Sequence, residues 1–182
     1  MARILCLGLA VIAMALLSSC ADTKHRLVVS VAEQRMAFFD QGNFVAMFPV
    51  STSRFCLSDS PGSFGTPLGH MKIAKKIGDG QPLGMKFKDR VPTGEIVAPN
   101  APGRDPVVTR ILWLEGVDPW NKNTFERDIY IHGTAEEYKL GHPASYGCVR
   151  MSSRDVAWLY DQVGKGARVD IVAGPMPQQL PQ

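Results

Sequence analysis

The sequence predicts a single, mostly β domain with one main α-helix near its C-terminal end. Short apolar runs rich in β-branched and aromatic residues recur along the chain, and clusters of Gly, Pro, Asn and Asp separate them. Only one strong helical pattern is present, at residues 153–163. The chain has 182 residues, of which 45% are hydrophobic and 20% charged, and these values favour one globular core over two.

The predicted strands recur along most of the chain. In chain order they are residues 27–31, 35–39, 44–50, 107–114, 128–132 and 168–172. The cluster Asp40-Gln41-Gly42-Asn43 marks a turn between the second and third runs, so the domain opens with a β-meander. Two long connections, residues 53–70 and 89–106, interrupt the pattern. Loops of that length are usually functional or disordered.

The single predicted helix spans residues 153–163. Its apolar face is formed by Val156, Leu159, Tyr160 and Val163. Ser152, followed by Asp155 three positions later, resembles a capping box with Asp in the Glu position. Gly164 and Gly166 follow the last apolar residue and are expected to end the helix. We therefore expect the helix to pack on the sheet through one face.

Residues 1–20 differ in composition from the rest of the chain. Arg3 gives a positive start, and residues 4–17 are apolar or small throughout, which predicts an export signal. This run is shorter than the roughly 20 residues of a bilayer-spanning helix. The segment Leu17-Ser18-Ser19-Cys20 resembles the lipobox of bacterial lipoproteins, in which the cysteine is acylated and anchors the protein to a membrane. An ordinary cleaved signal whose end happens to contain a cysteine is the alternative.

These features divide the chain into four parts. We expect a lipoprotein-type signal peptide at residues 1–19, a tether at 20–25, the domain at 26–173 and a flexible tail at 174–182. Such a protein would be exported to the cell envelope. It would be anchored to a membrane through Cys20, facing the periplasm or cell wall.

Charge and cysteine content exclude several classes of protein. The formal net charge of +3 comes from basic residues scattered among acids, which argues against a nucleic-acid binder. The histidines and cysteines have no metal-ligand spacing, so neither a metal ion nor another cofactor is predicted. If Cys6 leaves with the signal and Cys20 carries lipid, Cys56 and Cys148 remain. Cys56 is expected to be a small apolar filler or a loop thiol.

Cys148 and His132 are the residues best suited to catalysis. His132 ends an apolar strand, and Cys148 lies in a glycine-containing turn before the predicted helix. A thiolate is the nucleophilic form of cysteine, and a neighbouring imidazole can take its proton and hold it nearby as a cation. The two positions are too far apart for a local contact, so they meet only if the chain folds back. From these residues alone, an inert buried cysteine and a core histidine remain open alternatives.

Longer motifs around both residues resemble a known family. The L,D-transpeptidase (YkuD-type) catalytic domain has a signature similar to Ile131-His132-Gly133-Thr134 followed by Ser145-Tyr146-Gly147-Cys148-Val149-Arg150-Met151. An earlier Thr-Pro-x-Gly segment of that domain is similar to Thr66-Pro67-Leu68-Gly69. The resemblance covers roughly residues 26–173. It implies a β-rich catalytic fold of sandwich-like or barrel-like form.

The resemblance implies a role for each central residue. Cys148 would be the nucleophile that becomes acylated, and His132 the base that takes the thiol proton and returns it to the leaving amine. Gly133 would offer its carbonyl oxygen to the other ring nitrogen of His132. Backbone N–H groups around Gly147 and Cys148 would hold the oxyanion. Because this role needs a free thiol, a disulfide between Cys148 and Cys56 is disfavoured.

The roles of the substrate-binding candidates are less specific. Arg150 could bind a substrate carboxylate through its planar fork or brace the turn by hydrogen bonds. Ser145 could bond within the site or serve as a turn residue only. Tyr146 stands where many relatives carry a second histidine, and Tyr130 faces the same side of its strand as His132, so both are candidates for contact with substrate.

Two further features have open interpretations. Trp113 and Trp120 flank the segment 114–127, where members of the family carry a loop over the site. A lid that stacks on substrate and ordinary packing are both open. His142, a loop histidine beside Pro143, is expected to be exposed and without a role.

Peptidoglycan stem peptides are the expected partners. The leading hypothesis is an L,D-transpeptidase that forms cross-links or attaches protein to the wall through an acyl-enzyme on Cys148. Water as the acceptor would instead give an L,D-carboxypeptidase or a hydrolase that detaches wall proteins. A non-catalytic wall-binding lipoprotein with the same fold is the third alternative, and the intact His132 and Cys148 weigh against it.

Overall fold

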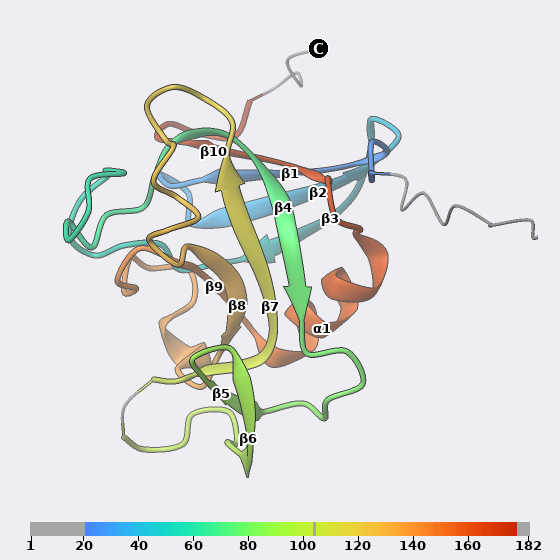
Figure 1. The fold of residues 1–182 in the computed structure, drawn as a ribbon, viewed down its shortest axis with the longest axis vertical. Coiled ribbons are helices and arrows are strands. Elements are labelled where there is room, and N and C mark those ends of the chain that lie inside the picture. Colours follow the sequence, from blue (N-terminus) through green and yellow to red (C-terminus); the bar gives the residue numbers. More distant parts are fainter. Residues whose placement is uncertain (1–20, 104, 178–182) are drawn as a thin grey trace, which may run out of the picture.

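One sheet of ten strands and one α-helix make up most of this computed structural model, which describes residues 21–103 and 105–177 (Figure 1). The strands are β1 (His25–Ser30), β2 (Arg35–Asp40), β3 (Asn43–Pro49), β4 (Gly69–Ile77), β5 (Met85–Lys88), β6 (Val91–Ile96), β7 (Val107–Gly116), β8 (Tyr130–Thr134), β9 (Val149–Met151) and β10 (Arg168–Val172). The helical elements are the 3-10 helix η1 (Glu137–Lys139) and the α-helix α1 (Ser153–Gln162). No helix in the described part of the chain has the length and apolarity to cross a bilayer. The predicted signal peptide, Cys20 and the end of the predicted tail lie outside the described residues.

The main path of the sheet runs β3-β2-β1-β10-β4-β7-β5-β6, and β8 and β9 extend it from β7. β1, β2 and β3 form the predicted antiparallel meander, with Asp40 opposite Asn43 at the second turn. β10 lies parallel to β1, so the last strand returns beside the first. The prediction of a mostly β fold with one main helix is confirmed.

β7 is the strand that joins the two parts of the sheet. Its first residues pair with β5 and its later residues with β4, while β8 pairs with it along most of its length. The register shifts between Val108 and Ile111, where Thr109 adopts a φ of 71°. The Thr109 hydroxyl accepts a hydrogen bond from the Gly84 N–H and donates one to Ser153 Oγ, which ties the irregular segment to its neighbours. β7 thus pairs with three other strands, β4, β5 and β8.

The main core lies between the sheet and α1. Val156, Leu159 and Tyr160 of α1 are buried, as the helical spacing predicts. Ser152 caps the helix, because its hydroxyl accepts the Asp155 N–H at 3.0 Å. The strands contribute Leu27, Val29, Met71, Ile73, Leu112, Leu114, Ile131, Met151 and Ile171 to the same core.

Four strands, β4, β5, β6 and β9, were not predicted from the sequence. The prediction that residues 89–106 form one long loop is wrong, because β6 occupies part of that segment. All six residues of β6 are exposed, and Pro92 and Gly94 lie within it, so no alternation of buried residues marks the strand. The strand conformation of β6 comes from its antiparallel pairing with β5. β9 has only three residues, all of them buried, and is too short to show a period.

Both ends of the described chain are attached to the domain. Asp22, in the predicted tether, accepts hydrogen bonds from the N–H groups of Gly164 at 2.6 Å and His25 at 3.2 Å. At the other end, the Gly174 carbonyl accepts a hydrogen bond from the Ser30 hydroxyl at 2.7 Å. Residues on both sides of the predicted domain, 26–173, therefore contact it, and the domain bounds stay a prediction.

Candidate active site

A cavity of about 450 Å³ contains the two residues predicted to be catalytic. His132 comes from β8 and Cys148 from the turn just before β9, and these two strands pair in parallel. Ser145, Tyr146 and Arg150 also line the cavity. The fold therefore brings together five residues that the motifs singled out.

His132 is held by its own strand. Its side chain is buried, and Nδ1 lies 2.7 Å from the carbonyl oxygen of Gly133, which is the contact expected from the motif. Gly133 has no room for a side chain, because a Cβ would lie 2.7 Å from the Val108 carbonyl oxygen. Burial lowers the pKa of His132 below its ordinary value. The ring is therefore neutral at neutral pH, and donation from Nδ1 leaves Nε2 to accept a proton.

Cys148 is half-buried and has two backbone neighbours. Its Sγ lies 3.4 Å from the Tyr130 nitrogen and 3.4 Å from the Asp128 carbonyl oxygen. Burial raises the pKa of the Cys148 thiol to about 11, although the Tyr130 N–H acts in the opposite direction. At neutral pH the site therefore holds a thiol and a neutral imidazole, and Cys148 could act as a nucleophile only after losing its proton.

The cysteine turn, which runs from Ser145 to Cys148, is fixed from inside and outside. The Ser145 hydroxyl donates to the Cys148 carbonyl at 2.6 Å and accepts the Gly147 N–H at 3.2 Å. Thr66, from the Thr-Pro segment, donates to the Gly147 carbonyl at 2.9 Å. Gly147 has a φ of 122°, and a Cβ there would lie 3.0 Å from the Gly65 carbonyl oxygen. The backbone at this position thus requires glycine.

Arg150 is braced by two carboxylates on the buried side of the cavity. Its Nη1 lies 2.5 Å from Asp105 Oδ2 and 2.9 Å from Glu136 Oε2, and only 5% of its side chain is exposed. Burial alone would raise the pKa of Glu136, but hydrogen bonds from Lys139 and Arg150 lower it below its ordinary value. Since the guanidinium already has counter-charges, the geometry favours the bracing role of Arg150. Asp105, Glu136 and Arg150 are referred to below as the arginine floor.

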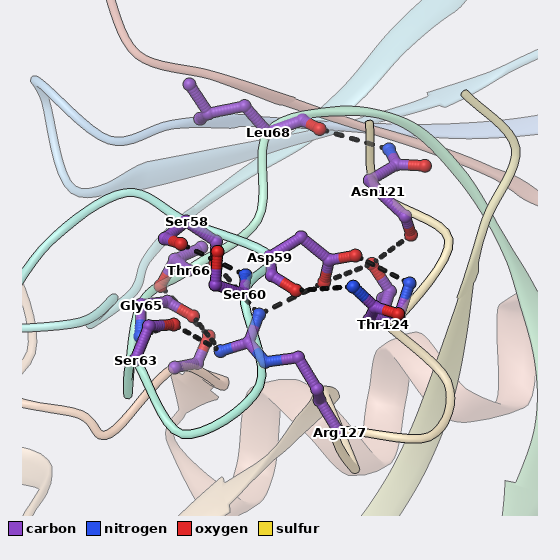
Figure 2. Close-up of polar contacts among 12 residues, drawn as sticks. Ser58, Asp59, Ser60, Ser63, Gly65, Thr66, Leu68, Asn121, Thr124 and Arg127 are labelled. Atoms are coloured by element: carbon purple, nitrogen blue, oxygen red, sulfur yellow. Dashed lines mark hydrogen bonds and ion pairs between the residues drawn. The ribbon is translucent and has the colours of Figure 1, made fainter. Parts of the chain in front are cut away.

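A second buried ion pair, drawn in Figure 2, joins the connection between β3 and β4 to the connection between β7 and β8. Asp59, in the loop after β3, and Arg127, in the loop before β8, are 3.0 Å apart, and their side chains are 4% and 8% exposed. Arg127 also donates to the Gly65 carbonyl at 2.8 Å. The next residue, Asp128, places its carbonyl oxygen beside Cys148 Sγ. This ion pair therefore holds the wall against which the thiol lies.

Tyr146, which lines the cavity, belongs to an exposed aromatic cluster whose other two members, Phe55 and Phe64, lie outside the lining. Tyr146 packs against Phe55 and Phe64, with ring centroids 5.1 Å and 5.7 Å away, and all three side chains are exposed. The Arg54 guanidinium lies 4.6 Å from the centroid of Tyr146 and 4.9 Å from that of Phe55. Phe55, Phe64 and Tyr146 are referred to below as the aromatic rim.

Two predicted aromatic contacts lie outside the lining of this cavity. Tyr130 is buried beside His132, with ring centroids 6.5 Å apart, and its hydroxyl accepts a hydrogen bond from Arg90 at 3.1 Å. Contact between Tyr130 and substrate therefore stays a prediction. Trp113 stacks on Phe125 at 4.3 Å and belongs to a second buried cluster. Of the two interpretations offered for Trp113, packing is the one observed.

The remaining candidates lie apart from the site. His142 is exposed, as predicted, and Trp120 is 67% exposed. Cys56 is an exposed loop thiol, and both Cys56 and Cys148 are free. Within residues 21–103 and 105–177, no three His, Cys, Asp or Glu side chains form a group that could hold a metal ion.

Comparison with known proteins agrees with the motifs. A model of the L,D-transpeptidase catalytic domain, YkuD, matches residues 24–171. The chain belongs to this family. It is 24% identical over 157 residues to the probable L,D-transpeptidase YbiS of Escherichia coli K12, a match that covers 85% of this chain and 47% of YbiS. It is also 39% identical over 46 residues to the probable L,D-transpeptidase ErfK/SrfK of Salmonella typhimurium, covering 25% of this chain and 15% of that protein. The chain spans less than half the length of these relatives.

Solved structures of L,D-transpeptidases share the fold. L,D-transpeptidase 3 from Mycobacterium tuberculosis matches with a TM-score of 0.52 and 16% identity, over 82% of this chain and 61% of the other. The Ldtfm-avibactam carbamoyl enzyme matches with a TM-score of 0.55 and 15% identity, over 84% of this chain and 50% of the other. At these identities the likeness concerns the fold, which is the one that the resemblance implied.

Several charged residues of the site had no signal in the sequence. Asp59 and Arg127 are 68 positions apart, and Asp105 and Arg150 are 45 apart. None of the first three lies in a family motif, and no local period links a buried charge to its partner. Arg54 was missed for the same reason, because its place in the cavity depends on the fold.

Proposed function

We propose that the chain is an L,D-transpeptidase that acts on peptidoglycan stem peptides through an acyl-enzyme on Cys148. One observation carries the proposal: Cys148 and His132 line the same cavity, and Nδ1 of His132 is bound to the Gly133 carbonyl. Nε2 is then the nitrogen that can take the thiol proton. Membership of the family supports the reaction class.

The first step forms the acyl-enzyme. Cys148 Sγ attacks the carbonyl carbon of an L,D-peptide bond, and the thiol proton passes to His132 Nε2. The C–N bond breaks, His132 returns the proton to the leaving amine, and a thioester remains on Cys148. Backbone N–H groups of the cysteine turn would hold the oxyanion. Because the Gly147 N–H already donates to Ser145, we assign this contact mainly to the Cys148 N–H.

The second step decides the product. An amine of another stem peptide or of a protein attacks the thioester, forms the new amide and releases the Cys148 thiolate, which regains its proton. Water in place of the amine would give an L,D-carboxypeptidase or a hydrolase that detaches wall proteins, with the same residues. Muropeptide analysis of a deletion strain separates the two. Loss of direct cross-links supports transfer, whereas accumulated tetrapeptides or retained wall-bound protein support hydrolysis.

Acylation of the thiol is tested by incubating the protein with a carbapenem and measuring its intact mass. One added drug mass is expected, located on the peptide that contains Cys148, and Cys148→Ala should gain none. His132→Ala should react about 10²–10⁴-fold more slowly, as for loss of a general base. An unreactive wild-type protein would refute the proposed acyl-enzyme. An unchanged rate in His132→Ala would show that His132 is not the base.

The cellular location is a separate part of the proposal. The composition of residues 1–20 supports export to the cell envelope, and the Leu17-Ser18-Ser19-Cys20 segment supports a lipid anchor at Cys20. Growth with an alkyne-labelled fatty acid should label the wild-type protein but not Cys20→Ala. A wild-type protein without label would be an exported protein with an ordinary signal.

A further inference from the structure

We propose that Arg54 is a carboxylate-binding subsite of the cavity, presented by the aromatic rim to an anionic peptide. Arg54 lines the same cavity as Cys148 and His132. The inference rests on the proposed function in one respect, because the peptide is taken to be the acyl donor.

Arg54 is anchored to the cysteine turn by its backbone and by its side chain. Its N–H donates to the Ser145 carbonyl at 3.1 Å, and its Nη2 donates to the Tyr146 hydroxyl. The guanidinium also lies over the rings of Tyr146 and Phe55, at 4.6 Å and 4.9 Å from their centroids. Such a guanidinium is already oriented, so little freedom is lost when a ligand binds.

Arg54 also differs from the other cations of the cavity in its lack of a counter-charge. Lys139 pairs with Glu136 at 2.6 Å, and Arg150 pairs with both Asp105 and Glu136. Among residues 21–103 and 105–177, no carboxylate forms an ion pair with Arg54. The charge of Arg150 is thus already balanced by buried carboxylates, whereas Arg54 is exposed and has no carboxylate partner among the described residues.

The chemistry of the ligand follows from these surroundings. A planar guanidinium binds a carboxylate through two parallel N–H donors, which selects a carboxylate over a neutral amide. The side chains of Phe55 and Phe64 beside it are 51% and 53% exposed, and they offer apolar surface to the aliphatic part of the same molecule. The expected ligand is a short peptide with a free carboxylate.

The test compares two forms of one synthetic stem tetrapeptide, the free acid and the same peptide with every carboxyl group amidated. Binding is measured by calorimetry on Cys148→Ala protein, so that no acyl transfer takes place. The acid should bind about 10- to 100-fold more tightly than the amide, as for a charge-assisted hydrogen-bonded pair. Arg54→Gln should bring this ratio close to one, and Arg54→Lys should keep part of it. Arg154→Gln, which removes the same charge at the start of α1 and lies on a different cavity, should keep the full ratio.

Two outcomes would overturn the subsite: neither peptide binds, or the acid is still preferred by Arg54→Gln. Carbapenem acylation of the protein with Cys148 intact is measured in parallel. No acylation together with an Arg54-dependent ratio would refute the proposed function alone. Normal acylation together with an acid-to-amide affinity ratio that is unchanged by Arg54→Gln would refute the subsite alone.

Discussion

Two arginines line the cavity, Arg150 in the arginine floor and Arg54 beside the aromatic rim, and their surroundings differ in burial and in charge. On the arginine floor, Arg150 is 5% exposed and lies between two carboxylates. Beside the aromatic rim, Arg54 is exposed, lies over two rings and has no carboxylate partner among the described residues. A buried guanidinium needs counter-charges because its desolvation is costly, whereas an exposed one does not. The charge of Arg150 is therefore balanced within the structure, whereas the charge of Arg54 is available for the ligand that we propose.

The largest expected effect concerns Cys148, where burial raises the pKa of a thiol in the same cavity as the two arginines. Alkylation by iodoacetamide should rise about tenfold per pH unit between about pH 7 and pH 10, because a thiol pKa of about 11 keeps the thiolate a minor species. The rate is followed by mass spectrometry of the peptide that contains Cys148. A rate that levels off near the ordinary thiol pKa of about 8.5 would show that burial does not control this group.

The rate of carbapenem acylation should depend on pH in the acidic range. It needs neutral His132, whose pKa burial lowers from 6.5, so the rate should fall only as the pH drops below that value. A loss of rate that begins above pH 6.5 would contradict the neutral, buried imidazole.

Removing the brace from the floor should give the largest loss of stability. Arg150→Leu leaves Asp105 and Glu136 without their shared counter-charge, and we expect the free energy of unfolding to fall by about 3–5 kcal/mol. Urea denaturation measures this change. A loss below about 1 kcal/mol would remove the bracing role and would reopen Arg150 as a substrate ligand.

Weakening the second buried ion pair should have a smaller effect. Asp59→Asn keeps the shape of the side chain and an oxygen acceptor, but it removes the charge that faces Arg127. We expect a loss of about 1–3 kcal/mol in the free energy of unfolding and slower carbapenem acylation, because the wall beside Cys148 loosens. Wild-type acylation in a destabilised Asp59→Asn protein would separate this ion pair from the site.

Replacement of Arg54, beside the aromatic rim, should give the smallest change in stability. Arg54→Gln should lower the free energy of unfolding by no more than about 1 kcal/mol, because the side chain is exposed and loses only its contacts with Tyr146 and Phe55. The same urea titration checks this value. A loss as large as that of Arg150→Leu would mean that the rim is structural, and the contrast between the two arginines would disappear.

Much of the fold could be predicted because its signals are local. The meander of β1 to β3 and the helix α1 follow from apolar periods, the Asp40–Asn43 turn and the Ser152 cap. β6 could not be found this way, since all its residues are exposed and only pairing with β5 makes it a strand. The same is true of the short, wholly buried β9.

The site shows the same division between short motifs and long-range contacts. The motifs indicated Cys148, His132 and the contact between His132 and the Gly133 carbonyl, because each of these lies within one short motif. They left the role of Arg150 open, since its two carboxylate partners come from other segments. They gave no sign of Arg54, Asp59 or Arg127.

By itself the sequence determined a mostly β domain of the L,D-transpeptidase family, and it indicated Cys148 and His132 as the candidate catalytic pair. Only the tertiary structure decided which arginine is buried and paired, which is exposed and free, and that the thiol and imidazole are both neutral at rest. The physical reason is that these properties depend on burial and on charges brought together across 45 and 68 residues. No local pattern in the chain contains that information.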